Sequence, residues 1–415
     1  MTKEKLTKLE KYWILYDVAN SAFILLVATI VPIYFNSLAE AAGISEVDYL
    51  AYWGYAASVA TLVVALIGPV FGTMADMKNF KKPIFTISMM VGVLGCAALS
   101  FPTSWVVFLA VFVIAKVGFS TSLIFYDSML SDVTKPERMD EVSSHGYAWG
   151  YIGSCVPFLI SLGIVLGNEA LGISMTVAMG ISFFLNAAWW LVLTLPLLRN
   201  YNQTHYSPKR EHAILDTFVT LCRTFREIKS QKHIFLFLLA FFFFIDGVYT
   251  IIDMATAFGS ALGFDSTMLL LALLLTQVVA FPFALIFGKA AKKYRNDTLI
   301  KICIVAYTVI ALFAIQLDQV WEFWLLAGCV GMFQGGIQAL SRSYFAKIIP
   351  PEKAGEYFGL FDICGKGASF MGTALVGLFT QMTGSTNWGI SILALIFVIG
   401  LVLFHYAAKE NPARK

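Results

Sequence analysis

The sequence is poor in charged residues and has no motif of a known catalytic class. Asp, Glu, Lys and Arg make up 13% of its 415 residues, against about 25% in an ordinary soluble domain. It contains no Walker, HExxH or GxSxG sequence, and its six cysteines and five histidines show no metal-ligand spacing. A membrane enzyme or an ATP-driven pump therefore has little support, and neither a metal nor a cofactor is expected.

Long apolar runs take the place of charge. Hydrophobic residues make up 59% of the chain, and runs of about 20 residues are the length at which an α-helix crosses a hydrocarbon core of about 30 Å. Because helices satisfy their own backbone groups in lipid, the sequence predicts twelve membrane-spanning helices. Their expected ranges are 12–39, 49–74, 83–101, 105–130, 143–166, 173–198, 233–262, 267–289, 298–315, 322–348, 357–382 and 388–408.

Basic residues are missing from every second connection between these runs. Apart from Lys116, Arg342 and Lys366, the Lys and Arg residues lie in the other connections, the adjoining helix ends and the two termini. Because basic loops stay in the cytoplasm, we expect both termini there. The protein is predicted to be a multi-pass protein of a bacterial cytoplasmic membrane.

A polar stretch divides the chain into two halves. We expect a six-helix bundle in 1–198, a cytoplasmic linker in 199–232 and a second six-helix bundle in 233–415. Apolar residues recur at steps of four and three between Ile214 and Ile228, with basic residues beside them. This pattern is typical of an amphipathic helix on the inner membrane surface, and a solvated linker helix is the equal alternative.

The two halves share short motifs, which indicates an internal repeat. Placing Pro136 on Pro351 also superposes Asp127 on Arg342. These two opposite charges lie toward the cytoplasmic ends of their predicted helices. We therefore favour an inner gate over substrate binding for this pair, although a guanidinium can also grip the carboxylate of a substrate.

Several stretches resemble a known superfamily. The loop at 72–76, which reads GTMAD, is followed by lysines and is similar to the signature loop of the major facilitator superfamily. The resemblance implies a gating latch formed by Asp76, Lys81 and Lys82. In the second half the corresponding loop, 288–292, has lysine in place of the acid, which puts a second latch in doubt.

Three further stretches resemble one branch of this superfamily, the fungal vacuolar amino-acid effluxers. They are 16–23 (YDVANSAF), 277–282 (QVVAFP) and 338–343 (QALSRS). The resemblance implies an all-α integral membrane fold, with twelve transmembrane helices in two pseudo-symmetric six-helix bundles. It also implies a central cavity that opens alternately to each side and is lined by the first, fourth, seventh and tenth helices.

Ionisable side chains within the predicted helices are the main functional candidates, because each costs at least about 2.5 to 3.5 kcal/mol at the bilayer centre. The eight are Asp17, Asp127, Asp246, Asp253, Asp362, Lys116, Arg342 and Lys366. As substrate-binding residues we predict Asp17, Asn20, Lys116, Asp246, Tyr249, Asp253, Arg342 and Lys366.

Some of these charges have simpler explanations. Lys116 suits a carboxylate or phosphate on the substrate, but an ion pair with Asp17 is the alternative. Lys366 and Asp362 are four residues apart, so a local pair explains them. The acids outnumber the bases, so some must be protonated, bind a cation or face water. We predict Asp17 or Asp246 as a proton-coupling residue, with a salt bridge to Arg342 or Lys366 as the alternative.

The predicted function is secondary active transport of a small polar solute by alternating access. An amino acid or another carboxylate-bearing molecule is the expected substrate, and the coupling ion, H⁺ or Na⁺, stays open. A flippase or exporter for a lipid or other amphiphile on the same fold is the alternative. We expect a monomer that contacts membrane lipid and its substrate, and no nucleic acid.

Overall fold

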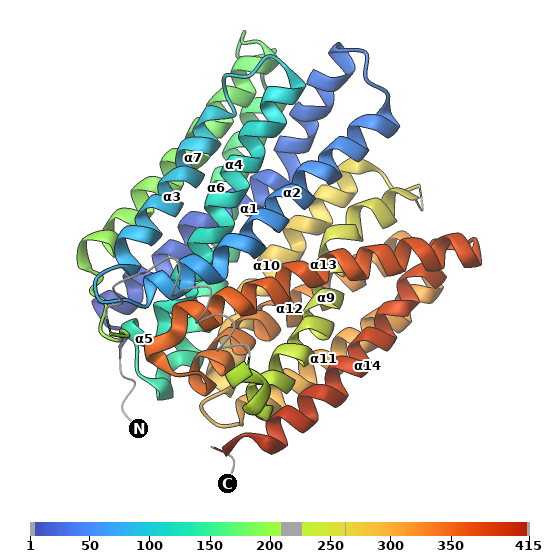
Figure 1. Ribbon diagram of the computed structural model, residues 1–415. Helices are drawn as coiled ribbons and strands as arrows, with labels where there is room; N and C mark the ends of the chain where they lie inside the picture. The colour runs from blue at the N-terminus through green and yellow to red at the C-terminus, as the bar shows by residue number, and fades with distance from the viewer. Residues whose placement is uncertain (1–4, 209–225, 262, 413–415) are drawn as a thin grey trace.

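Membrane-length helices make up the molecule. The computed structural model describes residues 5–208, 226–261 and 263–412, and twelve helices in these ranges are long and apolar enough to cross a membrane (Figure 1). This confirms the predicted fold class. Most of the predicted amphipathic helix lies outside the described residues. The limits of the linker between the two bundles therefore stay a prediction.

Each half contributes six of these helices. The first half holds α1 (Lys8–Ala41), α2 (Glu46–Ala75), α3 (Lys81–Ala98), α4 (Trp105–Ser128), α6 (Met139–Leu166) and α7 (Met175–Asn200). The second holds α9 (Lys232–Ala261), α10 (Ser266–Ala290), α11 (Asn296–Phe313), α12 (Val320–Ile348), α13 (Ala354–Thr383) and α14 (Thr386–Glu410). Every helix begins and ends within four residues of its predicted range.

Polar caps and glycines fix several helix ends. Thr7 and Glu10 form a reciprocal capping box at the start of α1, with Thr7 N donating to Glu10 Oε2 at 2.7 Å and Glu10 N donating to Thr7 Oγ1 at 3.2 Å. At the C-terminal end of α13, Gly384 has a φ of 67°. This left-handed conformation favours glycine.

The same short element precedes the fifth helix of each half. The 3₁₀ helices η1 (Pro136–Arg138) and η3 (Pro351–Lys353) each begin with proline and lead directly into α6 and α13. A further short helix, α5 (Leu130–Val133), lies before η1, and η2 (Ala314–Gln316) follows α11. The matched positions of η1 and η3 support the internal repeat.

The helices form two bundles that meet at one face. In the first bundle α1 packs on α6 and α7, and α3 packs on α4; in the second α9 packs on α13 and α14, and α10 packs on α12. Between the bundles α2 packs on α13, and α6 packs on α10. The bundles approach each other near the two termini and diverge away from them (Figure 1). We call the side of the termini the termini face and the opposite side the far face.

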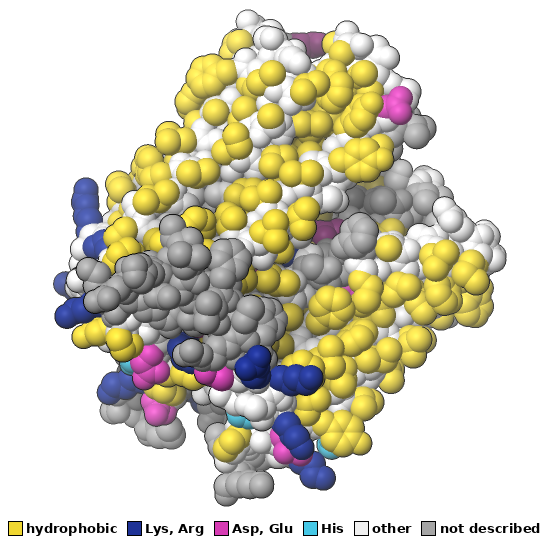
Figure 2. Space-filling view, viewed as in Figure 1, with side chains coloured by type: hydrophobic (Ala, Val, Ile, Leu, Met, Phe, Trp, Pro, Cys, Tyr) yellow, Lys and Arg dark blue, Asp and Glu magenta, His cyan; other side chains and the backbone are white. Residues whose placement is uncertain are grey.

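The surface reflects the same division. In the view of Figure 2 the Lys and Arg side chains gather at the termini face, most of the remaining surface is hydrophobic, and the molecule is indented between the bundles away from the termini. A hydrophobic belt of this kind matches a membrane environment. That the termini face is cytoplasmic stays a prediction.

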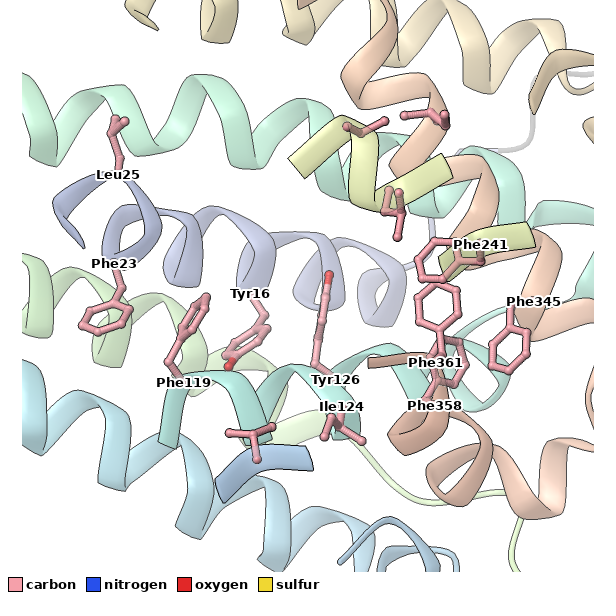
Figure 3. Close-up of a cluster of buried hydrophobic side chains, with 14 of the residues drawn as sticks. Tyr16, Phe23, Leu25, Phe119, Ile124, Tyr126, Phe241, Phe345, Phe358 and Phe361 are labelled. Carbon is pink, nitrogen blue, oxygen red and sulfur yellow. The ribbon is translucent and has the colours of Figure 1, made fainter. Parts of the chain in front are cut away.

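Aromatic side chains fill both bundles next to their boundary. In the first bundle Trp13 stacks on Tyr126 with ring centroids 4.4 Å apart. In the second Phe241 stacks on Phe361 at 4.0 Å, and Phe345 lies 4.9 Å from Phe361. Figure 3 shows the rings of Tyr126, Phe241, Phe345 and Phe361. This rigid packing fixes the helix faces that carry the charged residues.

Candidate functional site

The charged centre of the structure is Arg342 on α12. Its Nη2 lies 3.1 Å from Asp17 Oδ2 on α1, and its Nη1 lies 3.0 Å from Asp127 Oδ1 on α4. The arginine belongs to the second bundle and both acids to the first. The predicted pairing of Asp127 with Arg342 is therefore present in the structure. Asp17 forms the salt bridge to Arg342 that the sequence analysis gave as the alternative to proton coupling.

An aromatic cage surrounds this guanidinium. Its central carbon lies 4.3 Å from the ring centroid of Tyr147, 4.6 Å from that of Trp13 and 5.5 Å from that of Tyr126. Arg342 also donates from Nε to Ser143 Oγ at 2.9 Å and from Nη2 to the Ser143 carbonyl at 3.1 Å. With 2% of the side chain exposed, its attraction to the acids is little screened by water.

Asp76 joins the bundles in a second way. It follows the last residue of α2, and its carboxylate accepts from the backbone N–H groups of Gly355 at 2.7 Å and Glu356 at 2.9 Å. These are orphan donors in the first turn of α13, where a negative charge is stabilised by the helix dipole. Gly72 packs so closely on Gly355 that a Cβ on Gly72 would overlap the carbonyl oxygen of Gly355.

The two lysines of the signature loop act within the first bundle. Lys81 is fully buried, with its Nζ 3.9 Å from Asp76 and 3.4 Å from Asp132. Lys82 donates to the Tyr201 carbonyl at 3.3 Å. Asp76 therefore makes the contact between bundles, and the lysines hold the loop that carries it.

The second half has a corresponding contact with reversed charge. Lys292 occupies the position of Asp76 in the second copy of the loop, and its Nζ lies 2.8 Å from Glu141 Oε1 on α6. Glu141 is the repeat equivalent of Glu356. Lysine replaces the acid in this copy of the loop, and its partner across the boundary is an acid. A latch role for this second contact stays untested.

Sequence reasoning missed one cluster on the termini face. Asp140 on α6 accepts from Asn296 Nδ2 at 2.5 Å and from Ser343 Oγ at 2.6 Å, and it pairs with Lys347. The three donors belong to the second bundle. The predicted helix began at 143, four residues after the observed start at Met139, so the acid counted as a loop residue. The sequence signal that could have identified Asp140 is its position next to Glu141, shortly after the repeated Pro136.

Nearer the middle of the membrane, charges from both bundles share one region. Lys366 on α13 lies 2.5 Å from Asp362 and donates to the Ser120 carbonyl on α4 at 3.4 Å. The charges that act on Lys116, also on α4, come from Lys366, Asp253 and Asp362. Lys116 and Lys366 are half-buried and Asp253 is exposed. Among the described residues Lys116 makes no ion pair with Asp17, so that alternative is not formed.

Tyr249 adjoins both charged groups. It is half-buried on α9 and lies within the electrostatic influence of Asp362, Asp127, Asp253 and Arg342. It is therefore within electrostatic reach of both the caged arginine and the mid-membrane charges.

Two predicted residues lie apart from this region. Asn20 is 1% exposed and donates to the Tyr16 carbonyl of its own helix at 2.7 Å. Asp246 is fully buried between α9 and α13, where it accepts from Gly372 N at 2.9 Å and Thr250 Oγ1 at 3.4 Å. Its second oxygen, Oδ2, has no hydrogen-bond partner among the described residues.

This architecture defines a class of protein. Twelve spanning helices in two bundles, in contact at one face, are the fold of the major facilitator superfamily of transporters. The crystal structure of the major facilitator transporter FucP in the outward conformation has a TM-score of 0.72 at 13% identity, covering 96% of this chain and 97% of that one. The human organic anion transporter MFSD10 has a TM-score of 0.71 at 14% identity, covering 96% and 99%. These likenesses show the fold alone.

The chain belongs to the family of vacuole effluxer Atg22-like proteins, whose family model matches residues 7–137 and 131–415. It is 41% identical to the uncharacterized MFS-type transporter YxiO of Bacillus subtilis over 413 residues, 98% of this chain and 96% of that protein. It is 25% identical to Autophagy-related protein 22 of Coccidioides immitis over 85% of this chain and 72% of that protein. The protein is thus a multi-pass membrane transporter of the major facilitator type.

Lowering the pH is expected to favour the closed termini face. Burial raises the pKa of Asp76 to about 7, against the lowering effects of Lys81 and the two backbone N–H groups. In an open state this carboxyl would regain its ordinary value of 3.8. The closed state therefore binds the proton more tightly, and its population relative to the open state should rise about tenfold from pH 8 to pH 6.

Spin labels at the exposed residues Lys8 and Lys409, one on each bundle, would measure this by pulsed electron paramagnetic resonance in a cysteine-free background. Asp76→Asn should flatten the pH dependence between these limits. An asparagine variant with the wild-type pH profile would show that another group is responsible.

Removing the charge of Arg342 is expected to open the termini face. Arg342→Gln leaves two carboxylates unpaired in a buried site, and breaking a buried ion pair from one side costs about 3 to 5 kcal/mol. The same label pair should report a shift of at least about 100-fold toward the open state. Adding Asp17→Asn and Asp127→Asn removes the unpaired charges and should restore most of the closure. A triple variant as open as Arg342→Gln alone would contradict the electrostatic account.

Proposed function

We propose that this protein is a secondary active transporter of a small zwitterion, an amino acid being the preferred class, and that it works by alternating access. The observation that carries the proposal is the mid-membrane group of charges. Lys116 on α4 and the Lys366–Asp362 pair on α13 come from opposite bundles, and Asp253 lies on α9. A substrate carboxylate would bind the lysines and a substrate ammonium group the acids, each in exchange for its present partner. The resemblance to amino-acid effluxers supports the same class.

The structure fits one end state of such a cycle. Arg342, Asp76, Asp140 and Lys292 all contact the other bundle toward the termini face, and the bundles diverge toward the far face (Figure 1). If the termini face is cytoplasmic, this state is open to the outside. The similarity to FucP in its outward conformation is consistent with that assignment.

Arg342 is proposed as the gate of this cycle. Its pairs with Asp17 and Asp127 span the boundary between the bundles. A charge in hydrocarbon is tolerated only when it is paired or hydrated. Rocking of the bundles would therefore separate these pairs as water enters from the termini face, and it would re-form them as the face closes.

Asp246 is proposed as the proton-coupling residue in preference to Asp17. Asp17 is compensated by Arg342. Among the described residues, the hydrogen-bond partners of Asp246 are a backbone N–H and a hydroxyl, and its Oδ2 has none. A proton there would remove an uncompensated charge from the interior. H⁺ is the proposed coupling ion, because a proton on Oδ2 would neutralise this buried carboxylate without any further ligand.

A lipid or amphiphile flippase on the same fold is the alternative function. It would need an apolar groove open to lipid, with charge confined to a small patch. Charged residues on α4, α9 and α13 in the mid-membrane region favour a polar substrate instead.

Reconstituted protein should take up a labelled amino acid, and a pH gradient across the vesicle membrane should increase its accumulation. Purified protein in liposomes is tested with a panel of labelled amino acids and organic acids, with and without the gradient. Asp246→Asn should abolish the effect of the gradient but retain exchange of internal for external substrate. The control Glu169→Gln, at an exposed loop residue, should behave as wild type. Gradient-driven accumulation that survives in Asp246→Asn would rule out Asp246 as the coupling site.

The Lys116 charge should contribute to recognition of the substrate carboxylate. Lys116→Ala is expected to weaken binding by at least about tenfold, because a hydrogen-bonded charge is worth about 1.5 to 3 kcal/mol. Amidation of the substrate carboxylate should weaken binding to wild type but have little further effect on the variant. Lys289→Ala on the termini face is the control. Equal losses from amidation in wild type and Lys116→Ala would place the carboxylate elsewhere.

A further inference from the structure

The groups described above around the Arg342 guanidinium all belong to the first bundle. The rings, the two carboxylates and the serine come from α1, α4 and α6, whereas Arg342 comes from α12 of the second bundle. We call these six residues the cation cage: Trp13, Asp17, Tyr126, Asp127, Ser143 and Tyr147. Separation of the bundles would therefore remove the cation and leave its binding site behind.

Contacts within the first bundle brace the rings of the cage. Trp13 Nε1 donates to the Tyr126 carbonyl at 3.0 Å, and Tyr126 Oη donates to the Trp13 carbonyl at 3.1 Å. The ring of Tyr16 lies 4.6 Å from that of Tyr126, and its hydroxyl lies 2.7 Å from Ser122 Oγ. None of these contacts involves the second bundle, so we expect both rings to keep their places when Arg342 leaves.

A glycine provides the space in which the cation meets Asp17. A Cβ on Gly146 of α6 would overlap Asp17 Oδ2, and it would lie 3.0 Å from Arg342 Nη2 and 3.2 Å from the ring of Trp13. A side chain at this position would therefore displace the carboxylate or the cation. The first bundle thus leaves room for a cationic group beside its own carboxylate.

The chemistry of the vacated cage selects an organic cation. Among the described residues, Arg342 is the cation within ion-pair distance of Asp17 and Asp127. Two unpaired carboxylates in a largely buried site are costly, so the vacated cage needs another cation. Aromatic faces attract cations through their quadrupole, and aromatic cages typically bind organic ammonium groups. The ligand that fits is an ammonium or guanidinium group on an organic solute.

We propose that the cation cage is a second binding site for the solute, occupied by Arg342 while the termini face is closed and by an ammonium or guanidinium group of the solute while this face is open. The proposal rests on the alternating-access function and names the group that is recognised there. A bound solute would keep Arg342 out of the cage and hold the termini face open. Its departure would let Arg342 return and close that face.

The test measures calorimetrically how methylguanidinium, a probe with the cationic group of Arg342, binds to the purified full-length protein. Arg342→Ala should bind it at least about tenfold more tightly than wild type, because the wild-type cage is occupied. Adding Tyr147→Leu, which retains both acids, should weaken binding about fivefold through loss of a cation–π contact. The control Arg295→Ala, which removes an exposed arginine paired with Asp297, should bind as wild type does.

A second measurement does not require the Arg342→Ala variant to fold. Methylguanidinium should raise the open population of wild type, measured with the Lys8 and Lys409 label pair, relative to sodium chloride at equal concentration. Tyr147→Leu should reduce this effect.

The proposal is overturned if Arg342→Ala binds the probe no better than Arg295→Ala, or if the probe and sodium chloride act alike on wild type. Neither measurement depends on transport. A failure of the amino-acid uptake assay would therefore reject that substrate and leave the result for the cation cage interpretable.

Discussion

The structure depends on a guanidinium that two carboxylates of the other bundle share. Arg342 pairs with Asp17 and Asp127 inside an aromatic cage, where the guanidinium is shielded from water and would be costly to leave unpaired. These pairs are formed only while the bundles touch at the termini face. Opening therefore has to replace each pair by water or by another charged group. The same constraint applies to the clusters around Asp140 and Lys292 on that face.

The internal repeat explains why these contacts are complementary. Asp127 and Arg342 are equivalent positions, as are Asp76 and Lys292, and in both pairs one half carries an acid and the other a base. Equivalent positions on two related bundles come close to the same boundary, so identical residues would place like charges together there. Reversed charge turns that proximity into attraction between Asp127 and Arg342. Asp76 and Lys292 have separate partners: Lys292 pairs with Glu141, and Asp76 binds the backbone N–H groups of Gly355 and Glu356.

The fold could be predicted because apolar runs of membrane length leave few alternatives. The first turns of the helices are harder to predict where they are polar. The helix α6 begins at Met139, and Asp140 in its first turn lies before the apolar run from which the helix was predicted. The pairing of Asp127 with Arg342 followed from the repeat. The burial of Asp246 between two helices could not be predicted in this way. Its spacing from Asp253 indicated which face of the helix it lies on, but not which other helix packs against that face. The binding of Asp76 to the backbone N–H groups of Gly355 and Glu356 joins segments distant in sequence, without any periodic pattern.

One helix takes part in three of the interactions in the proposed mechanism. At its start α13 presents Gly355 and Glu356 to Asp76; in its middle it carries Asp362 and Lys366; further along, Gly372 N binds Asp246. From Gly355 to Gly372 this helix spans about 25 Å, at about 1.5 Å per residue. A helix moves as a unit, so a proton at Asp246 that alters its bond to Gly372 would act on the same helix that Asp76 contacts. The proposed coupling therefore needs no chain of small side-chain movements, only two positions of α13 that the two ends bias together.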